Sequence, residues 1–117
     1  MNQVSLIGRI TRPPVYYCTP RGMDLTRIQL LTHDRRGRAH HHHCLAYGPA
    51  ALTLHTHLET DNLLLIRGEL LYREHRRGDR VVDRPYVLIR QYSFLDAVSD
   101  DQALRPARNL SVVPGLE

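Results

Sequence analysis

Apolar and polar residues alternate in several stretches of the chain, and this alternation predicts β-strands. In residues 23–32, Ile28 and Leu30 alternate with Arg27 and Gln29, which is the two-residue period of a strand with one buried face. Further strands are predicted at 4–10, 40–47, 63–77 and 81–95, with a short extended piece at 16–18. The chain is therefore expected to consist mainly of strands.

One helix is expected between the third and fourth of the long strands. Pro49 opens it, because proline at the first helical position gives up an N–H that would have no partner there. Ala51, Leu54 and Leu58 are spaced to cover one face, and residues 61–62 end the helix. Five strands with a helix in this place predict an all-β fold, a five-stranded oligonucleotide-binding (OB) barrel.

Two residues within the strands indicate irregular geometry. Gly68 lies in the middle of the strand at 63–77, where a barrel strand would bend sharply. Pro85 interrupts the last strand and implies a bulge or a sheet edge. Residues 1–96 are expected to form the OB domain, and residues 97–117, which lack a regular apolar period, a flexible C-terminal tail.

Composition narrows the class of protein. The chain has 117 residues, 42% of them hydrophobic, which suits one domain with a modest core. No apolar run approaches the roughly 20 residues that cross a membrane, and the first residues do not resemble a signal peptide. Two cysteines make no disulfide framework. We expect a cytoplasmic protein without a membrane partner.

The distribution of charge suggests a polyanionic partner. All sixteen basic residues are arginine, and the formal net charge is +4. Residues 1–95 hold fourteen arginines against eight acidic residues, whereas residues 96–117 hold two against four. A basic body with a mildly acidic end points first to nucleic acid. A merely soluble basic protein is the alternative.

Five short stretches carry a resemblance to a known family. They are residues 1–10 (MNQVSLIGRI), 19–22 (TPRG), 44–48 (CLAYG), 65–70 (LIRGEL) and 92–95 (YSFL). In this order they resemble the opening strand, the "TPSG" turn, the "VVAFG" strand end, the "VYVEGRL" strand and the closing "MQFL" of bacterial single-stranded DNA-binding proteins. The resemblance implies an OB fold and sequence-tolerant binding of single-stranded DNA in replication, recombination or repair, by a homo-oligomer that is not an enzyme and needs no cofactor.

The chain departs from that family in three respects. The hairpin between the second and third long strands is short. Tryptophan is absent, and the motif alignment places His41 and His75 where the family has tryptophans. The last residues lack the family's aspartate cluster and terminal Pro-Phe, so recruitment of replication and repair proteins is doubtful. These departures favour an alternative, a module like primosomal replication protein N that mainly assembles protein partners in replication restart.

The resemblance also implies DNA contacts on two strands. In the strand at 40–47, His41, His43 and Tyr47 share one face, and Tyr47 lies where the family has a base-stacking phenylalanine. His40, His42, Cys44 and Ala46 take the other face, which is expected to be the core side. Arg73 and His75 match a basic and an aromatic DNA contact of the family.

Other residues are candidates for the DNA site because of their type. Arginine clusters in two hairpin turns are expected to contact phosphates, with ordinary solvated turns as the alternative. They are Arg35, Arg36 and Arg38 in one turn and Arg76, Arg77 and Arg80 in the other. Tyr16 and Tyr17 could also stack on bases, but neighbours on a strand face opposite sides, so we expect at most one to reach DNA.

Catalysis, metal binding and assembly complete the expectations. His43 and Cys44 are strand neighbours and cannot form a nucleophile–base pair. A His-rich metal-binding protein is a third hypothesis, but the run of four histidines splits between two faces, so no metal site is expected. The first strand has apolar residues on both faces, which predicts an oligomer interface and a dimer or tetramer. Its interface residues are Val4, Leu6, Ile7 and Ile10.

Overall fold

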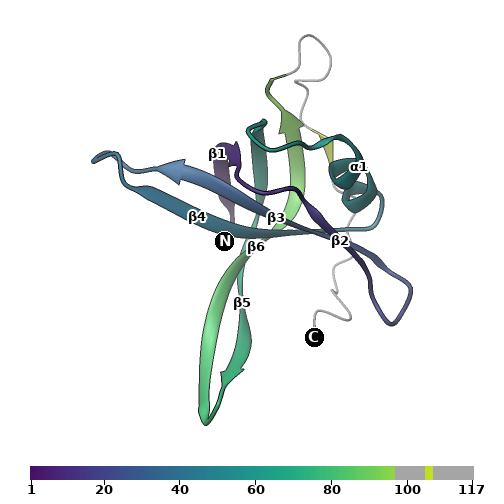
Figure 1. Ribbon diagram of the computed structural model, residues 1–117, viewed down its shortest axis with the longest axis vertical. Helices are drawn as coiled ribbons and strands as arrows, with labels where there is room; N and C mark the ends of the chain where they lie inside the picture. Colours follow the sequence, from purple (N-terminus) through teal and green to yellow (C-terminus); the bar gives the residue numbers. More distant parts are fainter. Residues whose placement is uncertain (97–104, 107–117) are drawn as a thin grey trace.

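The computed structural model describes residues 1–96 and the pair 105–106 (Figure 1). Along the chain the elements are β1 (Val4–Ile10), β2 (Val15–Cys18), β3 (Asp24–His33), β4 (Ala39–Tyr47), α1 (Pro49–His57), β5 (Leu63–Arg77), β6 (Arg80–Phe94) and β7 (Arg105–Pro106). All the strands belong to one sheet, and the helix lies between β4 and β5. The expected all-β class and the position of the helix are confirmed.

Five strands of the sheet form a closed ring. The order β1-β5-β6-β4-β3 is closed by pairing of β1 with β3 at Arg9 and Ile10, and β2 pairs with the first half of β3 along the same edge. β4 and β6 run parallel, with Cys44 opposite Val87, while the other pairs are antiparallel. The five long strands expected from the sequence are therefore those that make the ring.

The long strands begin and end within one residue of the expected bounds, whereas the helix and the C-terminal segment differ more. The helix ends at His57 rather than at residues 61–62, because Leu58 turns to extended backbone while its N–H still donates to the carbonyl of Leu54. In the segment expected to be a flexible tail, Arg105–Pro106 pairs with β6 as β7. The rest of that segment, residues 97–104 and 107–117, lies outside the described residues.

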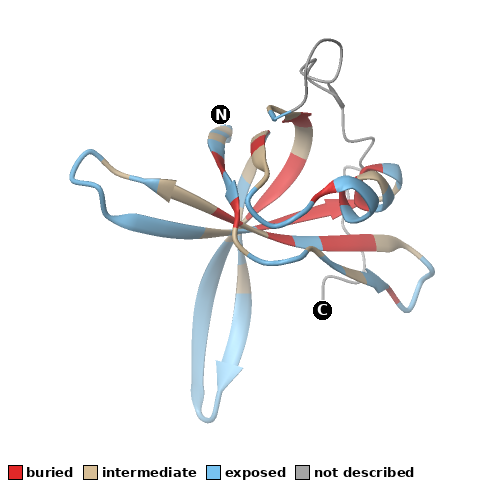
Figure 2. Ribbon diagram, turned by 45° about the horizontal axis from the view of Figure 1, so that its top comes forward, coloured by how far each residue is buried: buried red, intermediate tan, exposed pale blue. Residues whose placement is uncertain are grey.

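The main core fills the ring and extends under the helix. Buried aliphatic side chains from every ring strand meet there, among them Leu30, Leu64 and Ile89. Helix α1 adds Leu54, which is fully buried, and Thr26 of β3 donates a hydrogen bond of 2.7 Å to a carbonyl of the helix. Figure 2 shows this buried region at the crossing of the strands and beneath α1. The helix is thus fixed against one end of the ring.

Gly68 is required where β5 bends. A Cβ atom at this position would lie 1.9 Å from the carbonyl oxygen of Leu88, and the register between β5 and β6 shifts between Arg67 and Gly68. This irregularity lies where the sequence predicts a bend. Pro85 lies on a stretch of β6 that pairs, within the described residues, with β5 alone, so it occupies the expected edge.

Two hairpins extend from the ring into solvent. The β3–β4 arm comprises residues 31–42, and the β5–β6 arm comprises residues 71–86. Both arms are largely exposed beyond the point where they leave the core (Figure 2). Their roots meet on one side of the ring, and this junction positions the candidate site.

Candidate nucleic-acid interface

A cleft of about 330 Å³ lies where β3 and β4 face β5 and β6. Its lining residues are Arg27, Ile28, His43, Cys44, Leu45, Arg73, His75, Arg84, Pro85 and Tyr86. These residues supply three guanidinium groups, two imidazoles, one phenol and an apolar floor, and they include no carboxylate. Such a lining suits a ligand with phosphates and flat apolar rings.

The arrangement of the arginines in the cleft lowers the stability of the protein when no ligand is bound. Arg73 of β5 lies directly opposite Arg84 of β6 in the antiparallel register. Like charges in directly opposite positions destabilise a sheet, so this pair is favourable only when an anion neutralises it. Arg27 adds a third positive charge from β3. The charge of the lining therefore suits a polyanion.

Tyr86 supplies the phenol of the cleft. Its partial burial raises the pKa of the hydroxyl, the positive charge of Arg73 opposes this shift, and the negative charge of Glu69 adds to it. The hydroxyl therefore stays protonated near neutral pH and can donate a hydrogen bond. Glu69 itself is held by Arg90, whose Nη2 lies 2.6 Å from the carboxylate, so its charge is compensated beside the cleft.

Three of the residues predicted from the sequence meet in the cleft, namely His43, Arg73 and His75. His41 is exposed two positions from His43 on the same face of β4, just outside the lining. The sequence predicts that His40, His42, Cys44 and Ala46 lie on the core side of β4. This is confirmed at the C-terminal end of the strand, where Cys44 and Ala46 are buried in the main core.

Tyr47 requires a correction. The sequence predicts an open ring that stacks on bases, but the side chain is 2% exposed and packs in a second cluster with Leu25, Leu45 and Leu88. Residues from the β5–β6 arm cover that cluster, Leu71 among them. Both faces of β4 are therefore buried at its end, and Tyr47 presents no open face to a base in this structure.

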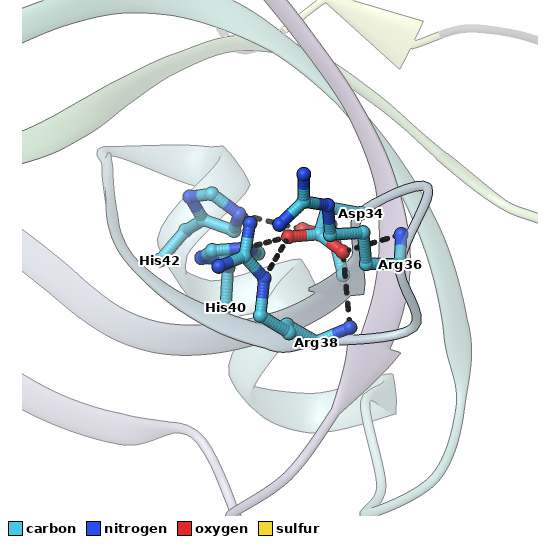
Figure 3. A network of polar contacts seen from close by, with 6 residues as sticks. Asp34, Arg36, Arg38, His40 and His42 are labelled. Carbon is cyan, nitrogen blue, oxygen red and sulfur yellow. Dashed lines mark hydrogen bonds and ion pairs between the residues drawn. The ribbon is translucent and has the colours of Figure 1, made fainter.

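The turn of the β3–β4 arm is organised by Asp34 (Figure 3). Its carboxylate accepts hydrogen bonds from the backbone N–H groups of Arg36 and Arg38, from Nε of Arg38 at 2.9 Å and from His40 at 3.0 Å. These contacts, that of His40 first, lower the pKa of Asp34 to about 2. Arg38 is thus neutralised by an ion pair, whereas the side chains of Arg35 and Arg36 make no ion pair with the residues that the structure describes.

The turn of the β5–β6 arm presents three exposed arginines. Arg77 and Arg80 flank the turn and lie opposite each other, and Arg76 lies opposite Val81. None of the three forms an ion pair within residues 1–96. Because side chains alternate along a strand, Arg76 lies on the opposite face of the arm from Arg73, away from the cleft.

The residues predicted for an oligomer interface divide between two faces of β1. Ile7 is 56% exposed, so it is available to a partner. Val4 and Leu6 are partly buried against the main core, and Ile10 is fully buried within it. The prediction is therefore wrong for Ile10, which cannot contact a second subunit because the chain's own core covers it.

The lining residues that were not predicted as contacts include two arginines and a tyrosine, namely Arg27, Arg84 and Tyr86. Arg27 is one of the outward positions of an alternating strand, and pairing of β3 with β4 places this face beside His43. Arg84 is brought to the site by its register opposite Arg73. Sequence alternation could have placed Arg27 on the correct face, but the register of β6 carries no local signal.

His42 and Cys44 of β4 make contacts within the chain, and the sulfur of Cys44 lies 3.7 Å from the carbonyl of His42. Thr32 hydrogen-bonds to His42 at 2.8 Å, and burial lowers the pKa of His42, with further lowering from the adjacent histidines. Burial raises the pKa of the Cys44 thiol to about 12, so it stays protonated. Within the described residues no group of three or more His, Cys, Asp or Glu is placed to hold a metal ion.

One comparison with known proteins identifies a family. The family model described as "Single-strand binding protein family" matches residues 1–95, which include every ring strand, α1 and the cleft. No curated protein matches the chain. In the described part of the chain, no helix has the length and apolar character needed to span a membrane.

Proposed function

The chain belongs to the single-strand binding protein family, and we propose that its cleft binds single-stranded DNA of any sequence. Members of this family are not enzymes, and they bind single-stranded DNA on an OB fold. The proposed role is in replication, recombination or repair, in the cytoplasm and in association with the nucleoid. The observation that carries the proposal is the opposed pair Arg73 and Arg84, joined by Arg27 in a cleft without a carboxylate lining.

The proposed mode of binding separates phosphates from bases. Phosphates lie at Arg27, Arg73 and Arg84, where each neutralised charge releases counterions. A base lies against the apolar floor around Leu45 and the ring of Tyr86, where stacking is worth about 1–3 kcal/mol and depends little on the identity of the base. Contacts of these two kinds read no base edge, which accounts for tolerance of sequence.

The arms extend the proposed phosphate path. Arg35 and Arg36 on one arm and Arg77 and Arg80 on the other are exposed, and no acidic residue neutralises them within the described chain. His43 and His75 lie in the cleft between these two turns. Arg38, which is already paired with Asp34, is proposed to contribute less.

Members of this family are typically oligomeric, and we propose that this chain forms at least a dimer through β1, with a tetramer if two dimers associate. Ile7 is the residue that favours this surface, because it is apolar and 56% exposed on the outer face of the strand. Light scattering tests it. Ile7→Arg should lower the molar mass in solution, and a parent that is monomeric at micromolar concentration would exclude the interface.

The alternative function is assembly of protein partners in replication restart, as in primosomal replication protein N. The small number of aromatic rings in the cleft favours it, since Tyr86 is the one tyrosine in the lining and tryptophan is absent from the chain. Titration of fluorescent oligo-dT at two salt concentrations separates the two functions. Tight binding that strengthens with oligonucleotide length supports the first, and weak binding independent of length supports the second.

A further inference from the structure

The cleft is too small to hold a whole binding site for single-stranded DNA. Its volume of about 330 Å³ is at the low end for small-molecule pockets, of a size for one nucleotide-like group. OB folds that bind single strands occupy about 4–16 nucleotides. The inference that follows rests on the proposed function and concerns where the strand runs after it leaves the cleft.

An exposed aromatic ring lies next to one end of the cleft. Tyr17 of β2 is 43% exposed, and the guanidinium carbon of Arg27 lies 5.3 Å from the centre of its ring. This distance is within the range of a cation–π contact. Arg27 also lines the cleft, so one side chain touches both the cleft and the ring of Tyr17.

The neighbouring tyrosine is turned away from this surface. The hydroxyl of Tyr16 donates a hydrogen bond to Asp24, and its ring lies 5.5 Å from that of His55 on α1. Tyr16 therefore packs between β2 and the helix, while Tyr17 points to the opposite, outer face of the sheet. Of the two tyrosines, Tyr17 is therefore the one whose ring is exposed to solvent.

The surroundings of Tyr17 suit a stacked base. Val15, directly opposite Arg27 in the β2–β3 register, is 48% exposed and extends the apolar surface beside the ring. Leu25, opposite Tyr17, is on the same face of the sheet and belongs to the second buried cluster. Arg27 fixes the orientation of the ring and supplies a positive charge for the adjoining phosphate.

We propose that Tyr17 and Arg27 form a second nucleotide subsite, at which the strand leaves the cleft, lays a phosphate against Arg27 and stacks a base on the ring of Tyr17. The ligand is a nucleotide of single-stranded DNA, without preference among the bases. Sites of this kind depend on a planar ring rather than on the phenol hydroxyl.

Another tyrosine provides a matched control. Tyr72 of β5 is 61% exposed, but it is absent from the lining of the cleft and lies on the opposite face of the arm from Arg73. Replacing it by alanine removes an exposed ring of the same kind from a surface that the proposed strand does not cross.

The test compares two lengths of ligand, thymidine monophosphate, which fills the cleft, and oligo-dT of about fifteen nucleotides, which covers an OB site. Affinities come from competition with a labelled oligonucleotide, for variants whose melting temperatures match the parent. Tyr17→Ala should bind the long oligonucleotide about fivefold or more weakly and should bind thymidine monophosphate with unchanged affinity. Tyr17→Phe and Tyr72→Ala should bind both as the parent does.

Each other result overturns the proposal in a distinguishable way. If Tyr17→Ala binds the long oligonucleotide as the parent does while Arg73→Gln weakens both lengths, the cleft stands and the subsite does not exist. If Tyr17→Ala weakens both lengths equally, the ring only positions Arg27 within the cleft. If the parent binds neither length, the proposed function fails and the subsite with it.

Discussion

Replacing Arg73 or Arg84 by glutamine should weaken DNA binding and at the same time leave the fold as stable or more stable. The two guanidinium groups lie directly opposite each other on β5 and β6. An opposed pair of like charges costs a sheet about 0.2–1 kcal/mol, so removal of one charge relieves this repulsion in the free protein. A residue kept only for stability would show the reverse, because its loss would lower the melting temperature.

The size of the binding effect follows from counterion release. Each phosphate neutralised on a single strand contributes about 0.7 to the slope of log affinity against log salt. One glutamine should therefore lower the slope by about 0.7, and the double variant by about 1.4. When the salt concentration rises fourfold, the affinity of a variant that lacks one phosphate contact should fall by a factor about 2.6 times smaller than that of the parent.

The assay is fluorescence anisotropy of labelled oligo-dT across a series of salt concentrations, with thermal melts of the same samples. Arg9→Gln is the matched control, because Arg9 lies on β1, contacts Asp96 at 3.9 Å and does not line the cleft. Its slope should equal that of the parent. An unchanged slope in the double variant, or an equal fall in Arg9→Gln, would refute the assignment of phosphates to the cleft.

Three further predictions concern the fold. His40 and the turn amides lower the pKa of Asp34 to about 2, so the ionised carboxylate stabilises the parent above pH 4, and this contribution is lost as the pH falls toward 2. Asp34→Asn should remove this contribution, and thermal melts of both proteins over this pH range test it. Gly68→Ala should destabilise the fold by about 3 kcal/mol or more, because a Cβ would meet a backbone carbonyl of β6, and denaturant unfolding measures the loss. Under native conditions a thiol reagent should modify Cys18, which is exposed, and spare Cys44, whose pKa is raised to about 12 by burial; reaction of both thiols before unfolding would contradict the burial.

The strands could be predicted from the sequence because their signal is local. Apolar residues mark the strands at 4–10 and 63–77, and Gly68 marks the irregularity in β5. The end of the helix was harder, because Leu58 continues the apolar spacing while its backbone is already extended. Local patterns fix the period of a strand, but they do not say which other strand covers each face.

That limit explains the error at Tyr47 and the missing contacts of the cleft. Alternation correctly places Tyr47 on the same face as His43, but this face is open at one end of β4 and covered at the other. The cover comes from Leu71, which is distant in sequence and whose position depends on the register of β5. Arg27 and Arg84 likewise meet only after the ring has closed.

The burial of Tyr47 also changes how the site is expected to gain its binding energy. In the cluster behind the cleft, its ring supports Leu45 instead of stacking on DNA. The rings left for bases lie farther out, at Tyr86 in the cleft and at Tyr17 beside it. Fewer stacked bases leave a larger share of the affinity to arginine–phosphate contacts, which gain free energy by releasing counterions. Binding should therefore be tolerant of sequence and strongly sensitive to salt. The arginines that increase the affinity for DNA are also those that place like charges together in the unbound protein.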